Sequence, residues 1–311
     1  MHTQAVVLEG PKRLGLKGLA LTDMTDADVA IDVRFSGIST GTERLFFLGN
    51  MPPFPGMGYP LVPGYESVGE VVEAGSATSL TPGQLVFVPG ASCFSDARCL
   101  FGATARNLIA AGDRVVPVDD MAPDDAVALA LAGTAAHALA LGPAPDLIVG
   151  HGVLGRLLAR IAMAKGGEPP VVWEKNVGRA AGAFDYPVVD PESDERRNYR
   201  CVVDASGDPN ILDTAISRLA PGGIVILAGF YSQPLSFQFP PAFLKEAQIR
   251  VVAQWQPEDM QCVLDLVRAD RLSLAGLVTH HEPAANAGAA YRTAFEDPAC
   301  LKMVLDWRSV A

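Results

Sequence analysis

The sequence has little of what marks secreted, nucleic-acid-binding or membrane-spanning proteins. It contains only five cysteines in 311 residues, an odd and scattered number that fits reduced thiols better than a disulfide framework. Acidic residues outnumber basic ones, and the formal net charge of -11 argues against binding to nucleic acid or to anionic lipid. No apolar run approaches the ~20 residues that span a bilayer, and the opening MHTQAVVLEGPKRLGLK holds no apolar signal core. We therefore expect a cytoplasmic protein with no transmembrane segment.

The closest pair of cysteines is also a poor metal site. Five residues separate Cys93 from Cys99, and no two further ligands follow at zinc-site spacing. Hydrophobic residues make up 49% of the chain and charged residues 19%, as in ordinary globular proteins. A chain of this length is long enough for two domains.

The pattern of apolar runs changes near residue 120. Before it, short β-rich runs such as VAIDVRFSG and SVGEVVEAG are bounded by Gly, Pro and Asp. After it, an Ala-rich helix is followed by apolar strands that alternate with helices, among them DLIVG, PPVVWE, CVVDAS and IVILAGF. Alternation at this pitch predicts βαβ units on a doubly wound parallel sheet, hence an α/β protein. After about residue 272 a mixed segment ends in CLKMVLDW, which we expect to return as a strand to the first domain.

A glycine-rich turn between a strand and a helix predicts a dinucleotide site. Gly150, His151, Gly152, Val153, Leu154 and Gly155 form G-x-G-x-x-G, and Glu174 ends the next strand 19 residues after Gly155. Glu174 should accept hydrogen bonds from the adenosine ribose and repel a 2′-phosphate, which favours NAD over NADP. Lys175 and Arg179 lie close by and would suit a phosphate instead. Residues after the next two strands complete the predicted cofactor set: Ala205, Ser206 and Phe230.

Taken in order, several motifs resemble the medium-chain dehydrogenase/reductase superfamily. They are GIS, PGYESVGEVVEAG, GHGVLG, VVDASG, APGGIVILAG and LKMVLDW, and they cover essentially the whole chain. The resemblance implies a GroES-like β domain (residues 1–118 and 273–311) and a Rossmann NAD-binding domain (residues 119–272). The stretch from Ser36 to Gly75 is similar to a branch that oxidises the hydroxyethyl side chain of a bacteriochlorophyllide to an acetyl group. This resemblance implies that the chain is an NAD-dependent secondary-alcohol dehydrogenase of bacteriochlorophyll biosynthesis, and that its substrate is a magnesium tetrapyrrole (a chlorin).

The chain departs from this superfamily at the positions where other members bind zinc. Ser39 and Tyr65 stand where those members have Cys and His, and the segment LALAG offers no third ligand. The segment after Val88 is too short for the four-cysteine structural zinc lobe. Neutral hydroxyls and apolar groups do not make a tetrahedral zinc site, so we expect no catalytic metal.

Without zinc, another group must accept the alcohol proton. Tyr65 is the first candidate for that catalytic role, since the resemblance places it at the reacting oxygen; as an alternative it forms an aromatic wall. Ser39, Thr40 and Thr42 can bind the substrate oxygen or relay a proton, or they serve only the turn. Glu66 either pairs with a basic residue such as Lys302 or supports Tyr65 from behind.

The segment 51–66, MPPFPGMGYPLVPGYE, is stiff and aromatic. Its five prolines and three glycines argue against a helix or an interior strand. We expect it to overhang a substrate cleft, with its aromatic rings available for stacking on a planar substrate. The predicted pocket residues are Phe46, Phe47, Met51, Phe54, Met57 and Tyr59, with Tyr231 from the similar segment 229–243. Either segment would alternatively form the interface of a homodimer.

The histidines and the rival functions remain open from the sequence. His137 suits a packed core position, and His151 is a candidate contact for a cofactor phosphate or ribose. His280 and His281 lie in the turn-like VTHHEP. Nothing in the sequence selects one of these histidines as a ligand for the magnesium of the substrate. One rival is a zinc-free NADPH-dependent quinone or enone reductase of the same superfamily. The other is a non-catalytic tetrapyrrole-binding protein.

Overall fold

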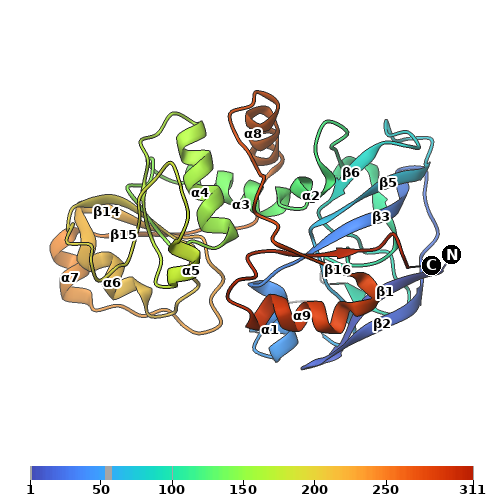
Figure 1. Cartoon of the computed structure of the whole chain (residues 1–311), viewed down its shortest axis with the longest axis horizontal. Coiled ribbons are helices and arrows are strands. Elements are labelled where there is room, and N and C mark those ends of the chain that lie inside the picture. Colours follow the sequence, from blue (N-terminus) through green and yellow to red (C-terminus); the bar gives the residue numbers. More distant parts are fainter. Residues whose placement is uncertain (1, 53–57, 100, 311) are drawn as a thin grey trace. The chain divides into compact units, whose positions relative to one another are not determined.

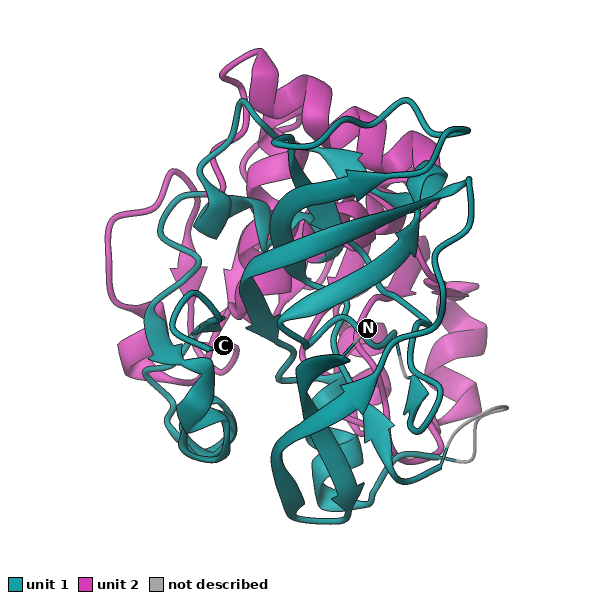
Figure 2. Ribbon diagram, turned by 90° about the vertical axis from the view of Figure 1, so that its right-hand side faces the viewer, with its two compact units in different colours: residues 1–130, 275–311 teal, residues 131–274 magenta. Residues whose placement is uncertain are grey.

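The computed structural model describes residues 2–52, 58–99 and 101–310, which divide into two compact units (Figure 2). Unit 1 consists of residues 1–130 and 275–311, and unit 2 of residues 131–274. The change of pattern along the sequence predicts the first boundary at 118/119, before the Ala-rich helical segment. In the structure the first part of that segment belongs to unit 1, so this boundary comes later in the chain.

Unit 1 contains most of the strands and is the more β-rich part (Figure 1). Its strands are β1 (His2–Gly10), β2 (Arg13–Ala20), β3 (Asp28–Ile38), β4 (Leu61–Val62), β5 (Ser67–Ala74), β6 (Leu85–Val88), β7 (Arg98–Cys99), β8 (Asn107–Ala111), β9 (Val116–Pro117), β16 (His280–Pro283) and β17 (Met303–Asp306). Its helices are α1 (Thr42–Leu48), η1 (Gly112–Arg114), α2 (Pro123–Ala126), η2 (Ala284–Asn286) and α9 (Ala287–Glu296).

Two sheets enclose the core of unit 1. One has the strand order β2-β1-β4-β7, and the other has the order β16-β17-β3-β5-β6-β9, with β8 also paired to β3. The C-terminal strand β17 lies antiparallel to β3, with Met303 opposite Ile38. Trp307, just after β17, is fully buried and donates from its indole nitrogen to Ser36 Oγ at 2.8 Å. The predicted return of the C-terminal segment to the first domain is therefore present as a strand pair.

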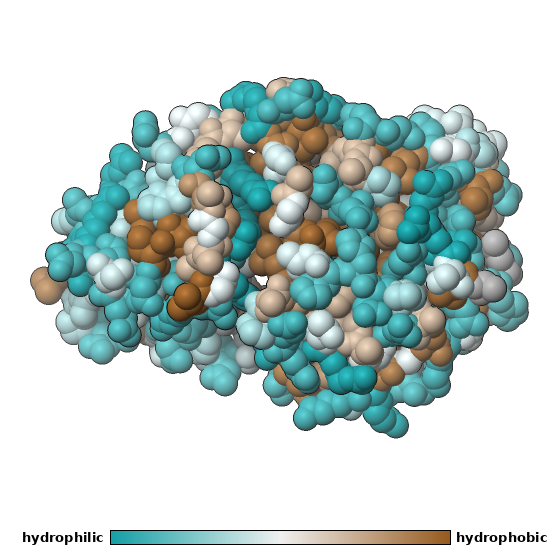
Figure 3. Space-filling model, in the orientation of Figure 1, coloured by the Kyte–Doolittle hydropathy of each residue, from teal (hydrophilic) through white to brown (hydrophobic). Residues whose placement is uncertain are grey.

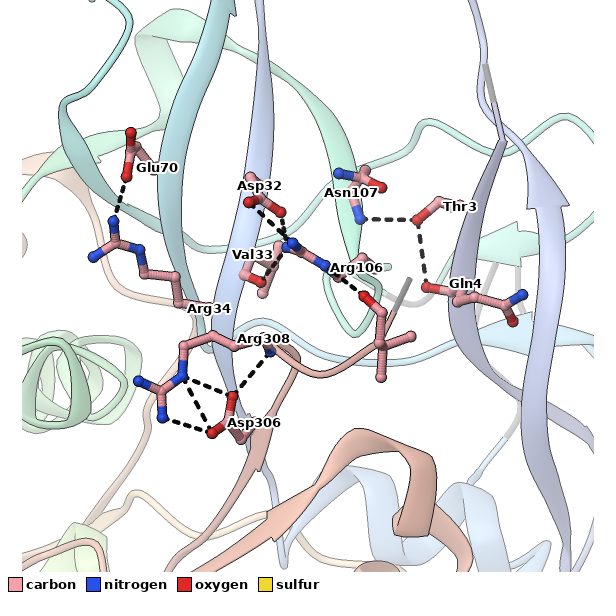
Figure 4. Close-up of polar contacts among 11 residues, drawn as sticks. Thr3, Gln4, Asp32, Val33, Arg34, Glu70, Arg106, Asn107, Asp306 and Arg308 are labelled. Carbon is pink, nitrogen blue, oxygen red and sulfur yellow. Dashed lines mark hydrogen bonds and ion pairs between the residues drawn. The ribbon is translucent and has the colours of Figure 1, made fainter.

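Arg106 fastens the last residues of the chain to the middle of β3 (Figure 4). Its guanidinium donates to the carbonyls of Val310 and Val33 at 3.0 and 2.9 Å, and it forms an ion pair with Asp32. A single planar side chain thus joins three segments that are far apart in the sequence.

Unit 2 is the predicted doubly wound domain. Its strands are β10 (Leu147–Val149), β11 (Val171–Trp173), β12 (Val188–Val189), β13 (Tyr199–Asp204), β14 (Leu219–Leu227) and β15 (Gln248–Val251). Its helices are α3 (Leu129–Ala140), which begins in unit 1, α4 (Val153–Ala164), α5 (Val177–Ala180), α6 (Ile211–Arg218), α7 (Phe239–Lys245) and α8 (Pro257–Arg268).

The six strands of unit 2 are all parallel, in the order β12-β11-β10-β13-β14-β15. Numbered within the unit this is 3-2-1-4-5-6, and the direction of winding reverses between β10 and β13. The α/β class and the Rossmann-type sheet expected from the sequence are confirmed. Ligands bind such sheets beyond the carboxyl ends of the strands at the point of reversal, which here is where β10 and β13 end.

Local structure differs from expectation in three places. Segment 280–283, read as a turn, is strand β16, because it pairs in parallel with β17. Leu61 and Val62, expected to join no interior strand, form the short strand β4 between β1 and β7; Pro60 and Pro63 lie just outside it. The strand predicted at IVILAGF begins five residues earlier than expected, since α6 ends at Arg218 and β14 begins at Leu219, ahead of the helix-breaking Pro-Gly-Gly.

Among the described residues, no helix is both long enough and apolar enough to cross a bilayer. On the face drawn in Figure 3, hydrophobic residues occur in small groups separated by hydrophilic ones.

Candidate active site

The glycine turn of unit 2 lies between the end of β10 and the start of α4, at the point where the winding reverses. Gly150 has φ +96°, and a Cβ there would lie 3.2 Å from the backbone of Ser206, in the turn after β13. A Cβ on Gly155 would lie 1.8 Å from the carbonyl oxygen of Gly150, whereas at Gly152 it would meet nothing within 4 Å. Backbone atoms thus pack closely against Gly150 and Gly155, whereas the space beside Gly152 is free for a ligand. It suits a pyrophosphate on the amino end of α4.

Glu174 follows β11 and is held by the backbone. Its Oε2 accepts from the amide of His151 at 3.2 Å, and its Oε1 accepts from the amide of Asn176 at 2.8 Å. Each carboxylate oxygen retains a lone pair for a ribose hydroxyl. Lys175 is exposed and Arg179 is half-buried, so both cations predicted near the cofactor lie on the same short segment as Glu174.

The side chain of His151 turns away from the open part of the turn. It is fully buried, with Nδ1 2.8 Å from the carbonyl oxygen of Arg179 and Nε2 3.0 Å from the hydroxyl of Tyr186. Burial lowers the pKa of His151, which keeps the ring neutral. Both ring nitrogens are therefore occupied within the protein, and the predicted contact of His151 with the cofactor stays a prediction.

The turn after β13 is braced by a buried carboxyl. Asp204 accepts from the hydroxyl and amide of Ser206 at 2.6 and 3.0 Å, and also from the hydroxyl of Tyr231. Burial raises the pKa of Asp204. The hydroxyl of Tyr231, predicted to face substrate, is thus occupied by Asp204, while Phe230 beside it is 46% exposed.

In unit 1, the two hydroxyls expected to replace zinc ligands lie together. Ser39 Oγ and the hydroxyl of Tyr65 are 2.5 Å apart, and the ring of Phe101 packs edge-on against Tyr65 with centroids 5.1 Å apart. Burial raises the pKa of Tyr65, the charge of Glu66 adds to the rise, and hydrogen bonds from Ser39 and Thr42 oppose it. The phenol is therefore neutral at physiological pH and can act only while it carries its proton.

The other hydroxyls of this turn differ in exposure. Thr40 is exposed, whereas Thr42 is half-buried at the start of α1 and close enough to Tyr65 to oppose the rise in the pKa of the phenol. Of the four hydroxyls proposed from the sequence, the structure brings Ser39, Thr42 and Tyr65 together.

Glu66 forms a buried ion pair with Lys302, the residue just before β17. The lysine also donates to the carbonyl of Ile38 at 3.3 Å. Burial raises the pKa of Glu66, and Lys302 opposes that rise. Among the described residues Glu66 Oε1 has no hydrogen-bond partner, so this carboxylate is only half satisfied.

Sequence reasoning missed Glu43, a second buried carboxyl next to these groups. Its Oε1 accepts from the amide of Ser39 at 3.2 Å and its Oε2 from the hydroxyl of Tyr291 on α9 at 2.5 Å. Burial raises the pKa of Glu43 to about 7. An acidic residue in the first turn of a short helix usually faces solvent, so only the residues around it in the fold could have marked it.

Most of the predicted pocket residues lie in a small apolar cluster of unit 1. Phe46 is 3% exposed and packs with Leu8 and Leu61, while Phe47, Met51 and Tyr59 border the same cluster. The hydroxyl of Tyr59 donates to the carbonyl of Phe46 at 2.5 Å. This arrangement favours a structural role for Phe46, and the substrate contacts of the other residues stay a prediction. Phe54 and Met57 lie outside the described residues.

Two further histidines pair with carboxylates. His137 Nδ1 lies 2.8 Å from Asp259, and His281 Nε2 lies 2.8 Å from Asp124. Burial raises the pKa of Cys93 to about 11, so that thiol stays protonated. Within the described part of the chain, no three His, Cys, Asp or Glu side chains are grouped as a metal site requires.

Comparison with known proteins agrees with this geometry. The model of the alcohol dehydrogenase GroES-like domain matches residues 25–139. The 2-desacetyl-2-hydroxyethyl bacteriochlorophyllide A dehydrogenase of Cereibacter sphaeroides is 54% identical over an alignment that covers 100% of both chains.

Two solved structures have the same fold at low identity. An alcohol dehydrogenase from Escherichia coli complexed with NADH has a TM-score of 0.84 at 19% identity, covering 98% of this chain and 99% of its own. A zinc-binding dehydrogenase from Sinorhizobium meliloti bound to NADP has a TM-score of 0.81 at 17% identity, covering 99% of this chain and 100% of its own.

Proposed function

The chain belongs to the bacteriochlorophyllide dehydrogenase family of the medium-chain dehydrogenases, and we propose that it oxidises the hydroxyethyl side chain of a bacteriochlorophyllide to an acetyl group, with NAD and without catalytic zinc. The observation that carries the proposal is the 54% identity, over the full length of both chains, to a relative of that name. A secondary-alcohol dehydrogenase needs a hydride acceptor and a proton acceptor, and each unit supports one of these.

The cofactor part rests on the glycine turn. The open position at Gly152, the close approach of Gly150 to Ser206 and the carboxylate of Glu174 fit a dinucleotide at the point where the winding reverses. When bound, NAD supplies the acceptor for the hydride. Glu174 favours NAD, because a 2′-phosphate beside its carboxylate would meet like charge. The two solved neighbours carry NADH and NADP respectively, so the preference depends on residues of this chain.

The proton part rests on the Ser39–Tyr65 pair. As the alcohol becomes a ketone, its hydroxyl proton must leave together with the hydride. A neutral Tyr65 accepts that proton as it passes its own to Ser39 Oγ, 2.5 Å away. In the same step Ser39 releases its own hydroxyl proton to water at the turn, where Thr40 is exposed. Such a relay never requires a free phenolate, which agrees with the raised pKa of Tyr65.

A zinc ion does not fit the residues at this position. Ser39 and Tyr65 offer neutral hydroxyls that bond each other, whereas zinc sites use thiolates, imidazoles and carboxylates. No step of the proposed mechanism passes through a metal.

The test is to incubate the purified protein with NAD and a hydroxyethyl chlorin, and to follow NADH and the pigment spectrum together. We expect equal amounts of NADH and acetyl pigment, unchanged by a chelator. Activity that disappears on chelation and returns with zinc would overturn the metal-free mechanism. Bound pigment without NADH formation would support the non-catalytic rival, and NADPH-driven reduction of enones would support the reductase.

The cofactor preference has its own prediction. NAD should exceed NADP by at least about tenfold in kcat/KM, or about 1.4 kcal/mol. Glu174→Ala should reduce this ratio, since the carboxylate is the group that rejects the 2′-phosphate. Equal use of both cofactors by the unmodified protein would contradict the role of Glu174.

A further inference from the structure

The imidazole of His151 ties the glycine turn to one neighbouring segment. We call residues 174–186, which run from Glu174 to Tyr186, the adenosine-side segment. His151 contacts it at three points: its amide donates to Glu174, and its two ring nitrogens bond the carbonyl of Arg179 and the hydroxyl of Tyr186. His151 lies between two glycines of the turn, is fully buried and has both ring nitrogens bonded, so its ring links two segments as well as packing in the core.

The partners of the ring determine its tautomer. The carbonyl of Arg179 can only accept, so the hydrogen of His151 is on Nδ1. Nε2 then accepts from the hydroxyl of Tyr186, which is a donor there. A neutral imidazole has one donor nitrogen and one acceptor nitrogen at a fixed angle, so a flipped ring or the other tautomer would lose the hydrogen bond to the Arg179 carbonyl.

Arg156 and Phe184 make further contacts between the glycine turn and the adenosine-side segment. Arg156, in the first turn of α4, donates to the carbonyls of His151 and Arg179, both at 3.2 Å. Its guanidinium lies over the ring of Phe184, 5.0 Å from the centroid, and Phe184 packs edge-on against His151 at 4.6 Å. The carbonyl of Arg179 thus accepts hydrogen bonds from two side chains, that of His151 in the glycine turn and that of Arg156 in α4.

From these contacts we infer that His151 is a positioning residue for cofactor selectivity: it holds Glu174 and the adenosine-side segment in the geometry that recognises the unphosphorylated ribose of NAD. The inference rests on the proposed function only in that the cofactor is a nicotinamide dinucleotide. Because one oxygen of Glu174 is held by the His151 amide, a shift of the turn displaces the carboxylate that distinguishes NAD from NADP. A merely structural histidine would affect stability and both cofactors alike.

The experiment measures dissociation constants for NADH and NADPH by fluorescence titration of the purified protein, with no pigment present. His151→Gln can keep a contact at the position of Nε2 but not the one to the Arg179 carbonyl. We expect it to weaken NADH at least tenfold and NADPH less than threefold. Tyr186→Phe removes a single oxygen and should weaken NADH about threefold, again with little change for NADPH.

The matched control is His137→Asn, which removes another histidine contact in the same unit, that with Asp259. It should leave the NADH to NADPH ratio unchanged. The inference is overturned if His151→Gln binds NADH within twofold of the unmodified protein, or weakens both cofactors equally. Should that variant not fold, Tyr186→Phe decides, and an unchanged ratio in it overturns the inference. Unmodified protein that binds NADH but oxidises no chlorin would refute the proposed function and leave this inference standing.

Discussion

The proposed proton transfer depends most on one group, the hydroxyl of Tyr65. Tyr65→Phe keeps the ring and its contact with Phe101 but removes the bond to Ser39. We expect kcat to fall by roughly 10²–10⁴-fold, the usual loss for a general acid–base group, with the KM for pigment nearly unchanged. Steady-state kinetics with NAD and a hydroxyethyl chlorin measure both.

A suitable control is Tyr199→Phe, which removes a hydroxyl bonded to Asp194 in unit 2, outside the proposed machinery. It should leave kcat unchanged. If Tyr65→Phe turned over normally, the relay would have to run through Ser39, Thr40 or Thr42, and single removal of each hydroxyl would identify it. Normal turnover in all four variants would mean that solvent takes the proton.

Glu43 makes stability depend on pH in a specific direction. Its pKa is about 7 in the folded protein, above the ordinary 4.5, so the folded state binds its proton more tightly than the unfolded state does. Stability therefore falls as pH rises from about 4.5 to 7, by something on the order of 3 kcal/mol. Glu43→Gln should flatten this part of the profile. Urea unfolding at several pH values measures it, and an equally steep profile in the variant would contradict the burial of an ionisable Glu43.

At the scale of elements, the Glu66–Lys302 pair joins the start of β5 to the start of β17. Lys302→Met leaves a buried carboxylate without its cation and should cost about 3–5 kcal/mol in urea unfolding. Adding Glu66→Gln should recover part of the loss, because the uncompensated charge is then gone. Lys17→Met, which breaks an exposed pair with Glu9, should change little. Equal small effects at both pairs would show that the buried pair is not structurally important.

The elements of unit 2 could be predicted from sequence because local signals agree there. Apolar β-branched strands such as β10 and β14 alternate with helices, and Gly150, Gly152 and Gly155 mark the turn between a strand and a helix. Unit 1 was harder, since its short strands pair with distant segments. His280–Pro283 is a strand only because β17 lies beside it, and no local pattern shows that.

The candidate site was predictable to the extent that it follows from motifs. The glycine turn and Glu174 are local features, and the Glu66–Lys302 pair was considered because the resemblance pointed to it. Glu43 was not found, since its burial comes from Tyr291, which is 248 positions away in the sequence. The orientation of the His151 ring depends in the same way on Arg179 and Tyr186.

For the molecule as a whole, the exposed edge of unit 2 favours a homodimer. Strand β15 ends the parallel sheet, and Val251 on it is 73% exposed. Nearby in the sequence, on α7, Phe239 and Phe243 are each 66% exposed and Leu244 is 78% exposed. An unpaired strand edge tends to associate, exposed apolar side chains add to this tendency, and a second copy can pair with the edge about a two-fold axis.

We expect light scattering coupled to size exclusion to give twice the chain mass of 32.7 kDa. Val251→Lys should shift the protein toward the monomer, because a charge on this edge opposes strand pairing. Val72→Lys, at another exposed valine on β5 of unit 1, is the control and should leave the mass unchanged. A monomeric unmodified protein would contradict the interface.

The return of residues 275–311 to unit 1 has a consequence for the order in which the protein is made. A ribosome releases the chain from its amino end, so residues 131–274 emerge as one continuous piece and can fold while synthesis continues. Residues 35–38 of β3, by contrast, gain their partner on one edge only when β17 has been made, and the same holds for Glu66 and Lys302. The part proposed to bind the dinucleotide would therefore be finished first, and the part proposed to handle the alcohol proton only after β17 has been made. A transcript that ended before the codons of β17 would yield a chain with all of unit 2 but with a strand of unit 1 missing.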